Sequence, residues 1–535
     1  MCGFLLIKDF TENNIDLNKK EEELIKFYLH PRGPDEFNEV NLPGIRAFHA
    51  RLKIRGGKQG TQPVHVEDEM LVYNGELYSL EAKDFSDTQF FFENIERILN
   101  LNLNLDGIFS AAYFDKKKQI VSLIRDKWGT KPLFFSISKE KLYACSSLRL
   151  LASLLEVTED QASIDTFNQL GFFYGDTTPF NEIKKVKPGG ISNFFLKENK
   201  IYKKFKSFSS NKESFTSDSI ENALKSQLIS DVPIGLLLSG GVDSSILAYH
   251  MSKSSDSIFF NVTSEIFKNL DESSNTKIIE NKLNKKIKKL FINEELLKNS
   301  LNASIDSLDL PVSDSSIILN YLIYKLIKKE GVPVCLTGVG ADELFGGYTR
   351  FKILDFIFIL NLLKILIPKF IFKLLSKFIK NPRLKKFTKN GFSNYLDLFS
   401  DTKNFKKNNL IVNLNKREIL NFERYEYLTN SLLSFTDGIS MHHSIEARVP
   451  YLSNLVSTDE ILNNKYFSPN KYYLKKIRKS LYKNKFQEEK KGFAIKNDEL
   501  KQQFKDQEVI NRGDFGSIVL ARWMKNLDNN LKNVS

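Results

Sequence analysis

The alternation of apolar and polar residues changes character partway along the chain. Short β-rich runs at 69–73 and 111–114 are typical of stacked antiparallel sheets. After about residue 212 the periodicity becomes helical, and apolar runs at 258–262 and 332–336 stand between the helical segments. That alternation predicts a doubly wound parallel sheet with its site at the strand ends. We therefore expect two domains, the first of α+β class and the second of α/β class.

A Pro-Gly turn at 187–190 and a polar stretch at 207–212 lie between the two patterns. Because such segments interrupt regular structure, we place the linker near 196–212 and predict domains over 1–196 and 213–535. A length of 535 residues suits this division, since single domains typically have about 50–250 residues. A hydrophobic content of 41% is enough for two cores.

One loop of the second domain has the composition of an anion-binding site. Residues 239–245 read Ser-Gly-Gly-Val-Asp-Ser-Ser, after the apolar run 234–238 and before the apolar segment 246–249. Glycines let the backbone approach phosphate oxygens, serines add hydroxyl donors, and a helix N-terminus adds partial positive charge. The loop lacks the Gly-Lys-Ser/Thr ending of a Walker A motif. By itself it is also typical of an ordinary strand-to-helix turn.

The chain begins Met1-Cys2-Gly3. If the initiator methionine is removed, Cys2 carries a free α-amine beside its own thiol. An α-amine with a pKa of about 7.7–8.0 can take the thiol proton and later return it to a leaving group, so no histidine is required. A chance Met-Cys start is the alternative, and the residues downstream decide between the two.

Four downstream blocks resemble those of the class II glutamine amidotransferases, which share the N-terminal-nucleophile fold: residues 32–35, 49–52, 73–78 and 86–87. The resemblance implies that Arg51 binds the α-carboxylate of glutamine, while Glu76 and Asp87 hold its α-ammonium. It also implies that the Asn74 side chain and the Gly75 backbone N–H form an oxyanion hole for the attack by Cys2. Asn-Gly also favours a type I′ hairpin turn, which would expose backbone N–H groups at this point.

The loop at 239–245 resembles the pyrophosphate loop of ATP pyrophosphatases, which split ATP into AMP and pyrophosphate. Three further blocks, 336–348, 440–452 and 490–493, resemble the asparagine synthetase family. The order and spacing of all the blocks are similar to those of glutamine-hydrolysing asparagine synthetases over most of the chain. The implied fold is an N-terminal-nucleophile sandwich of antiparallel sheets, followed by a doubly wound ATP-pyrophosphatase domain with extra helices.

The same resemblance implies a nucleotide site that uses ATP and Mg²⁺. The implied residues are Leu237, Val262, Thr337 and Gly338 at the adenine and ribose, and Ser239, Gly240, Gly241, Asp243, Ser244, Asp342 and Lys490 at the phosphates. Asp243 and Asp342 would hold the Mg²⁺ ion. Lys490 would neutralise phosphate charge, although a lysine in a basic run is also typical of a solvated surface.

One position departs from the family pattern. The family block normally reads Ser-Gly-Glu-Gly, whereas this chain has Thr337-Gly338-Val339-Gly340. Valine cannot accept a proton, and relatives that close β-lactam rings carry tyrosine here, so the position varies with the acceptor. Ser453 stands where the family more often has aspartate, a lesser departure that we interpret as structural.

The resemblance implies ATP-dependent conversion of L-aspartate and L-glutamine into L-asparagine, L-glutamate, AMP and pyrophosphate, through an acyl-adenylate. Ammonia would pass between the two sites through the interior.

Because Val339 replaces the family glutamate, a second activity is an alternative: the amidation of another carboxylate, such as a sugar uronic acid in surface-polysaccharide assembly. A third alternative is a nucleotide-binding regulator without catalytic activity. The presence of the expected functional residues argues against it; these are Cys2, Arg51, Asp243 and Lys490. A β-lactam-forming activity is the weakest, and a homodimer is plausible from the resemblance.

Charge and composition add little to this picture. The net charge of +13 comes from a lysine-rich bias that is spread over the chain, and we recognise no nucleic-acid-binding module. We therefore expect the protein to bind ATP as its anion and not to bind nucleic acid.

Segment 354–379 is rich in Phe, Ile and Leu, but Asp355, Pro368 and several lysines interrupt it. This predicts amphipathic helices. We expect an internal helical layer rather than a surface that attaches to a membrane.

The cysteines and histidines show no metal-binding or disulfide spacing. Cys2, Cys145 and Cys335 form no Cys-x-x-Cys motif, which implies a reducing cytosol. The six histidines do not have the spacing of zinc ligands. The apolar stretch 4–7 is too short for a signal peptide, so we expect a cytoplasmic protein. The tail from Val509 onward has no assigned role.

Overall fold

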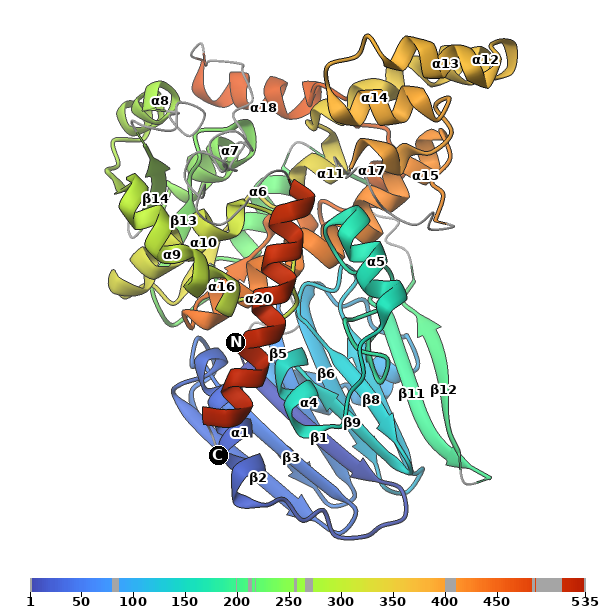
Figure 1. The fold of residues 1–535 in the computed structure, drawn as a ribbon. Helices are drawn as coiled ribbons and strands as arrows, with labels where there is room; N and C mark the ends of the chain where they lie inside the picture. Colours follow the sequence, from blue (N-terminus) through green and yellow to red (C-terminus); the bar gives the residue numbers. More distant parts are fainter. Residues whose placement is uncertain are drawn as a thin grey trace.

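The computed structural model describes residues 2–78, 86–198, 200–209, 214–216, 218–254, 257–264, 273–399, 410–483, 486 and 512–533. The chain forms an antiparallel sandwich at one end and a parallel sheet covered by helices at the other (Figure 1). The predicted fold class is confirmed.

Two six-stranded antiparallel sheets form the sandwich. One has the order β10-β8-β9-β1-β3-β2, from β1 (Cys2–Asp9), β2 (Glu36–Leu42), β3 (Ile45–Arg51), β8 (Phe134–Ser138), β9 (Lys141–Cys145) and β10 (Ile183–Lys185). The other has the order β12-β11-β7-β6-β5-β4, from β4 (Val64–Val66), β5 (Glu69–Leu77), β6 (Gly107–Asp115), β7 (Ile120–Arg125), β11 (Gly190–Lys197) and β12 (Lys200–Ser207). Alternate residues such as Phe4, Leu6 and Val72 fill the space between the sheets.

Helices flank the sandwich: α1 (Lys19–Leu29), α2 (Asp87–Glu93), α3 (Ile95–Leu99), α4 (Leu148–Leu154) and α5 (Gln161–Leu170). The predicted linker at 196–212 is wrong over its first part, because β12 pairs with β11 along its whole length, from Gly190 opposite Ser207 to Lys197 opposite Lys200. The lysine-rich sequence of β12 suits an edge strand, where exposed charge opposes further pairing. Both β11 and β12 therefore belong to the sandwich.

The second unit is built on a five-stranded parallel sheet of order β15-β14-β13-β16-β17. Its strands are β13 (Ile234–Leu237), β14 (Ile258–Thr263), β15 (Ile287–Phe291), β16 (Val334–Leu336) and β17 (Glu446–Arg448). Around it lie α6 (Ser219–Ser226), α7 (Val242–Met251), α8 (Ser273–Leu283), α9 (Glu294–Asp306) and α10 (Ser316–Lys329). The central strands are mostly buried, as a sheet with both faces covered requires.

The remaining helices are α11 (Ala341–Phe345), α12 (Ile357–Leu366), α13 (Lys369–Ser376), α14 (Pro382–Lys389), α15 (Lys416–Asn421), a π-helical stretch (Phe422–Leu433), α16 (Ser434–His442), α17 (Asp459–Leu462), α18 (Tyr472–Tyr482) and α20 (Arg512–Asn533). Short 3₁₀ turns lie at His30–Arg32, Gly57–Gly60, Thr349–Phe356, Tyr395–Leu398 and Pro450–Leu452. In the described part of the chain, no helix combines the length and the apolar character needed to cross a bilayer.

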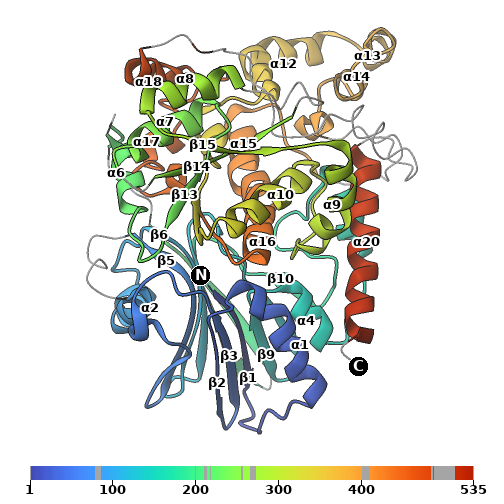
Figure 2. The same cartoon turned by 90° about the vertical axis from the view of Figure 1, so that its left-hand side faces the viewer.

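Segment 354–379 forms α12 and α13, so the prediction of helices is confirmed. The prediction that they form an internal layer is wrong. No residue of α12 is buried, and in α13 only Phe372 and Ser376 are. The two helices lie at the end of the molecule farthest from the sandwich (Figures 1 and 2).

The two units are joined through buried polar contacts. Asp437 of α16 accepts from Arg32 Nη2 at 2.7 Å and from Lys131 Nζ at 3.1 Å, both in the sandwich. Burial alone would raise the pKa of Asp437, but these two cations hold it below its usual value. Helix α20 packs on α9 and also on α5 and α4, so the last described helix contacts both units (Figure 2).

Candidate active site

Cys2, at the start of β1, is buried beside Asn74 of β5. The Cys2 backbone N–H donates to Asn74 Oδ1 over 3.0 Å. Asn74 is fully buried, and within the described structure its Nδ2 has no hydrogen-bond partner. A buried, unpaired amide donor is costly unless a ligand uses it. This geometry places a free donor next to the predicted nucleophile, as an oxyanion hole requires.

Gly75 does not lie in a hairpin turn, contrary to one expectation from Asn-Gly. It lies inside β5, where it pairs with Phe109 of β6. Its φ of +150° favours glycine, and a Cβ here would lie 2.1 Å from the Ile108 carbonyl oxygen. The strand excludes any side chain at this position. The alternative of a turn is therefore wrong, because the Asn-Gly preference is local whereas the pairing with β6 involves residues more than 30 positions away.

The environment of the Cys2 thiol favours its reactive form. Burial would raise its pKa, but the neighbouring His49 and a hydrogen bond from the Leu52 backbone contribute to lowering it to about 7. His49 lies on β3, and its Nε2 is 3.1 Å from the Tyr73 carbonyl oxygen. Sequence reasoning assigned His49 no role, because the contact depends on the pairing of β1 with β3.

Arg51 lies directly opposite Cys2 in the β1–β3 pair. Its Nη1 is 3.3 Å from Glu36 Oε2, and its Nη2 donates to the Gly57 carbonyl oxygen over 2.6 Å. A Cβ on Gly60 would lie 2.2 Å from Arg51 Nη2, so a larger residue there would force the guanidinium to shift. The structure thus brings Arg51 beside Cys2 and fixes its orientation.

Glu76 and Asp87, the predicted ammonium ligands, are both buried. Asp87 Oδ1 pairs with Arg55 at 3.1 Å, and Oδ2 accepts from the Leu77 backbone N–H. Burial and the nearby Asp87 raise the pKa of Glu76 well above its usual value, although Arg448 opposes this. Burial also raises the pKa of Asp87. A bound ammonium would favour the charged forms of both carboxyls.

The second site lies where the strand order reverses, between β13 and β16. From β13 the chain proceeds outward through β14 and β15, and the other half of the sheet begins at β16. Ligands bind at such switch points, outside the carboxyl ends of the strands. Ser239, Gly240 and Gly241 follow β13 and lead into α7, while Thr337 and Gly338 follow β16. Leu237 ends β13 and Val262 lies near the end of β14.

Hydrogen bonds within the loop fix its conformation. Ser239 Oγ accepts from the Gly241 N–H over 3.2 Å and lies 3.1 Å from Ser244 Oγ. Gly240 has a φ of +87°, which favours glycine. The N-cap residue of α7 is Gly241, which has no side chain to cap the helix. These features suit a phosphate group at the start of this helix.

Asp243 and Asp342 converge on one cation. Lys471 Nζ lies 2.7 Å from Asp243 Oδ2 and 2.6 Å from Asp342 Oδ1. Burial would lower the pKa of Lys471, but these two carboxylates raise it above its usual value. Two carboxylates that face one point fit Mg²⁺, which prefers oxygen ligands. Sequence reasoning missed Lys471, because a single lysine in a lysine-rich chain gives no signal.

Val339, three positions before Asp342, carries an apolar side chain where the family has a carboxylate, and it packs against a buried hydrophobic cluster. Its N–H contacts Thr337 Oγ1 at 3.4 Å. Buried Glu343 follows Asp342 and accepts from the Tyr348 hydroxyl. Burial and Asp342 raise the pKa of Glu343 to about 7. Lys490 lies outside the described residues.

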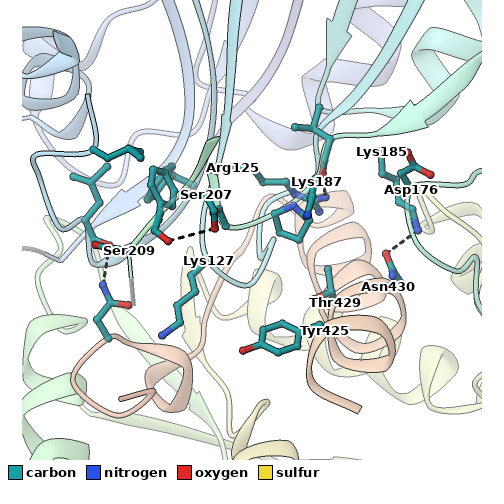
Figure 3. Close-up of a pocket in the computed structure, with 18 of the residues that line it drawn as sticks. Arg125, Lys127, Asp176, Lys185, Lys187, Ser207, Ser209, Tyr425, Thr429 and Asn430 are labelled. Carbon is teal, nitrogen blue, oxygen red and sulfur yellow. Dashed lines mark hydrogen bonds between the residues drawn. The ribbon is translucent and has the colours of Figure 1, made fainter. Parts of the chain in front are cut away.

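A cavity of about 590 Å³ lies at the junction of the two units (Figure 3). Its lining includes Arg125, Lys127 and Lys185 but none of the predicted site residues. Protein oxygens already satisfy these cations: Lys127 Nζ donates to the Ser457 carbonyl oxygen over 2.7 Å, and Lys185 Nζ to Asn430 Oδ1 over 2.7 Å. The cavity is therefore part of the junction and separate from the two predicted sites.

A cysteine beside an unpaired amide donor, on the same chain as a loop suited to phosphate, is the combination expected of a glutamine amidotransferase joined to a nucleotide-dependent synthase. The chain belongs to the asparagine synthase family. The asparagine synthase domain matches residues 216–506, and a glutamine amidotransferase domain matches residues 1–206.

Individual relatives are moderately similar. Asparagine synthetase [glutamine-hydrolyzing] 1 of Bacillus subtilis (strain 168) is 29% identical over 390 residues, which cover 66% of this chain and 60% of that protein. Putative asparagine synthetase [glutamine-hydrolyzing] 1 of Methanocaldococcus jannaschii is 30% identical over 348 residues, 59% of this chain and 60% of that protein. Amidase chyE of Penicillium rubens is 25% identical and covers 66% of this chain and 60% of that protein. The chain thus spans about 60% of the length of these relatives.

Proposed function

We propose that the protein hydrolyses glutamine at Cys2 and uses the ammonia, with ATP, to convert a carboxylate into an amide. The first candidate acceptor is L-aspartate, which would give L-asparagine, L-glutamate, AMP and pyrophosphate. The observation that carries the proposal is the pair of carboxylates, Asp243 and Asp342, converging at the switch point of a chain that also buries Cys2 against Asn74.

In the first half-reaction, the Cys2 thiolate attacks the carboxamide carbon of glutamine. The Asn74 amide and the Gly75 N–H stabilise the oxyanion that forms. The α-amine of mature Cys2 would return a proton to the departing ammonia, and water then releases glutamate from the thioester. The position of the Cys2 nitrogen, 3.0 Å from Asn74 Oδ1, supports this role by fixing the amine beside the reacting bond.

In the second half-reaction, the substrate carboxylate attacks the α-phosphorus of ATP, which gives an acyl-adenylate and pyrophosphate. Asp243 and Asp342 would hold Mg²⁺, which supplies positive charge to the phosphates when bound. The loop from Ser239 to Gly241 would donate to phosphate oxygens. Ammonia displaces AMP from the acyl-adenylate and leaves the amide.

A second acceptor class is favoured by one observation. Val339 places an apolar side chain where the family has a proton-accepting glutamate, so another carboxylate, such as a sugar uronic acid, is the alternative substrate. The proposal includes a Mg²⁺ ion at the nucleotide site and assembly of the chain as a homodimer.

The test is mass-spectrometric detection of AMP and amide after incubation of the protein with ATP, Mg²⁺, glutamine and either L-aspartate or a panel of uronic acids. Asparagine and AMP in equal amounts would establish aspartate as the acceptor. AMP that depends on a uronic acid would establish the second class. Nucleotide binding without AMP formation on any carboxylate would contradict the proposal in favour of a regulator.

The Cys2→Ala variant separates the two half-reactions. It should lose glutamine-dependent synthesis and retain synthesis from added ammonium chloride. Equal loss of both would refute the division between the two sites.

A further inference from the structure

Exposed apolar side chains concentrate in one segment that neither half-reaction uses. Among the described residues, eleven of nineteen exposed large hydrophobic side chains lie within 356–384. They are Phe356, Phe358, Ile359, Leu362, Ile365, Leu366, Phe370, Leu374, Leu375, Phe378 and Leu384. Phe358 and Ile365 are each 80% exposed, and Phe378 is 86% exposed. A cluster of this size is unusual on a soluble surface and marks an interaction site.

The spacing of these residues gives each helix one apolar stripe. On α12, Phe358, Leu362 and Ile365 recur at intervals of four and three residues. On α13 and the turn after it, Phe370, Leu374 and Phe378 recur every four residues. The stripes are those of helices that bury one face, yet no element among the described residues covers them. We call residues 356–389 the α12–α14 surface.

The same segment is strongly basic. Its cations are Lys364, Lys369, Lys373, Lys377, Lys380, Arg383, Lys385, Lys386 and Lys389, and residues 356–389 contain no aspartate or glutamate. Lys386 contacts Asp397 at 3.9 Å. The structure, in the part it describes, shows no carboxylate partner for Lys369, Lys373 or Lys377. These three lysines form a row one position before the row of Phe370, Leu374 and Phe378, so charged and apolar rows run side by side along α13.

The α12–α14 surface lies at an extremity of the molecule. Figures 1 and 2 both show α12, α13 and α14 at the end opposite the sandwich, and α12 and α13 project from the body. A flat partner could therefore approach this surface without meeting the sandwich.

We propose that the α12–α14 surface docks on a membrane that contains anionic phospholipid. Phe, Ile and Leu side chains would enter the interface between headgroups and acyl chains, and the lysines would contact the lipid phosphates. A second copy of the chain fits less well, because pairing two such surfaces would bring two sets of like charges together. A nucleic acid would neutralise the lysines but leave the apolar stripes exposed to water.

The test is flotation of the full chain with vesicles of pure phosphatidylcholine and with vesicles that also contain phosphatidylglycerol. We expect binding to the anionic vesicles, weakened by high salt. The triple variant Lys369→Glu, Lys373→Glu, Lys377→Glu should weaken binding by roughly a hundredfold, since each basic residue near an anionic bilayer contributes about fivefold. The double variant Phe370→Glu, Phe378→Glu places charge in the apolar stripe and should abolish flotation with the anionic vesicles.

Matched controls come from the rest of the chain. Phe291, 68% exposed on β15, provides Phe291→Glu as the apolar control. Exposed lysines of the sandwich provide Lys117→Glu, Lys139→Glu, Lys200→Glu as the charge control. Both controls should bind like the parent. As a direct probe of insertion, the fluorescence of Phe378→Trp should shift to the blue on anionic vesicles.

Three results would overturn the proposal: no flotation with anionic vesicles, equal flotation of the parent and the Phe370→Glu, Phe378→Glu variant, or a Phe378→Trp spectrum that vesicles leave unchanged. A concentration-dependent dimer that this double variant disrupts, without vesicle binding, would instead assign the surface to a second copy. None of these measurements depends on catalysis, so they remain informative whatever the acceptor is.

Discussion

The guanidinium of Arg448, on β17, lies 4.0 Å from the carboxylate of Glu76, on β5, and both side chains are buried. Arg448 Nε also contacts Glu446 at 2.5 Å, and its Nη1 donates to the Gln227 carbonyl oxygen over 2.6 Å. The strand that carries Asn74 and Gly75 is thereby linked to the edge of the parallel sheet. The positive charge of Arg448 thus lies beside two buried carboxyl groups, one from each unit.

Replacement of Arg448 should therefore destabilise the whole chain. Arg448→Met leaves Glu446, whose pKa Arg448 helps to lower, buried without that cation, and loss of one partner of a buried pair costs about 3–5 kcal/mol. The free energy of unfolding, measured by urea denaturation, should fall by that amount, and Arg448→Met, Glu446→Gln should recover part of it. As a control, Lys19→Met removes an exposed contact of 3.9 Å with Glu23 and should change little. A similar effect of both single substitutions would contradict the prediction.

The glutaminase rate should rise with pH through about 7. The thiolate is the nucleophile, and the pKa of Cys2 is lowered to about 7, so the thiolate fraction falls roughly tenfold for each pH unit below that value. His49→Gln removes one cause of the lowering and should move the profile to higher pH. The rate of alkylation by iodoacetamide should report the ionisation of the Cys2 thiol. Burial raises the pKa of Cys145 and Cys335 and keeps both of those thiols protonated, so they should not react. If His49→Gln did not change the pH dependence of the rate, His49 would not be a cause of the lowered pKa of Cys2.

Gly75→Ala should disable the glutaminase half-reaction. Its Cβ would collide with the Ile108 carbonyl oxygen, and the resulting shift of β5 would displace the oxyanion donors. Overpacking of this kind costs about 1–3 kcal/mol, and loss of an oxyanion donor costs about 10²–10³-fold in rate. Gly175→Ala is the matched control, since Gly175 also has a positive φ, +59°, but no atom lies within 4 Å of its Cβ position. If both variants lost glutaminase activity equally, backbone strain alone would explain the effect.

The parts of the site that lie in short sequence motifs could be predicted from the sequence, whereas contacts between distant segments could not. Cys2, Asn74 and Arg51 lie together as expected, because β1, β3 and β5 bring three short motifs to one end of the sandwich. The alternative that Asn74–Gly75 forms a hairpin turn is wrong, because Gly75 pairs with Phe109 of β6, and a pairing between residues this far apart in the sequence is a tertiary property. Lys471 gave no signal, since its partner Asp243 is 228 positions away. For α12, periodicity revealed an apolar face but could not reveal whether a core lies opposite it.

Asp342→Asn should abolish AMP formation and leave glutamine hydrolysis intact. The substitution removes one of two carboxylates that face the Lys471 position, so the site loses half of its charge for Mg²⁺. ATP–pyrophosphate exchange should fall by about two orders of magnitude, with a higher Mg²⁺ concentration needed for half-maximal rate, whereas glutaminase activity should match the parent. Asp459→Asn is the control, because Asp459 lies at the start of α17 outside the switch point. A loss of glutaminase activity in Asp342→Asn would show that the aspartate stabilises the fold as a whole. Exchange that survived in this variant would place the metal ligands elsewhere.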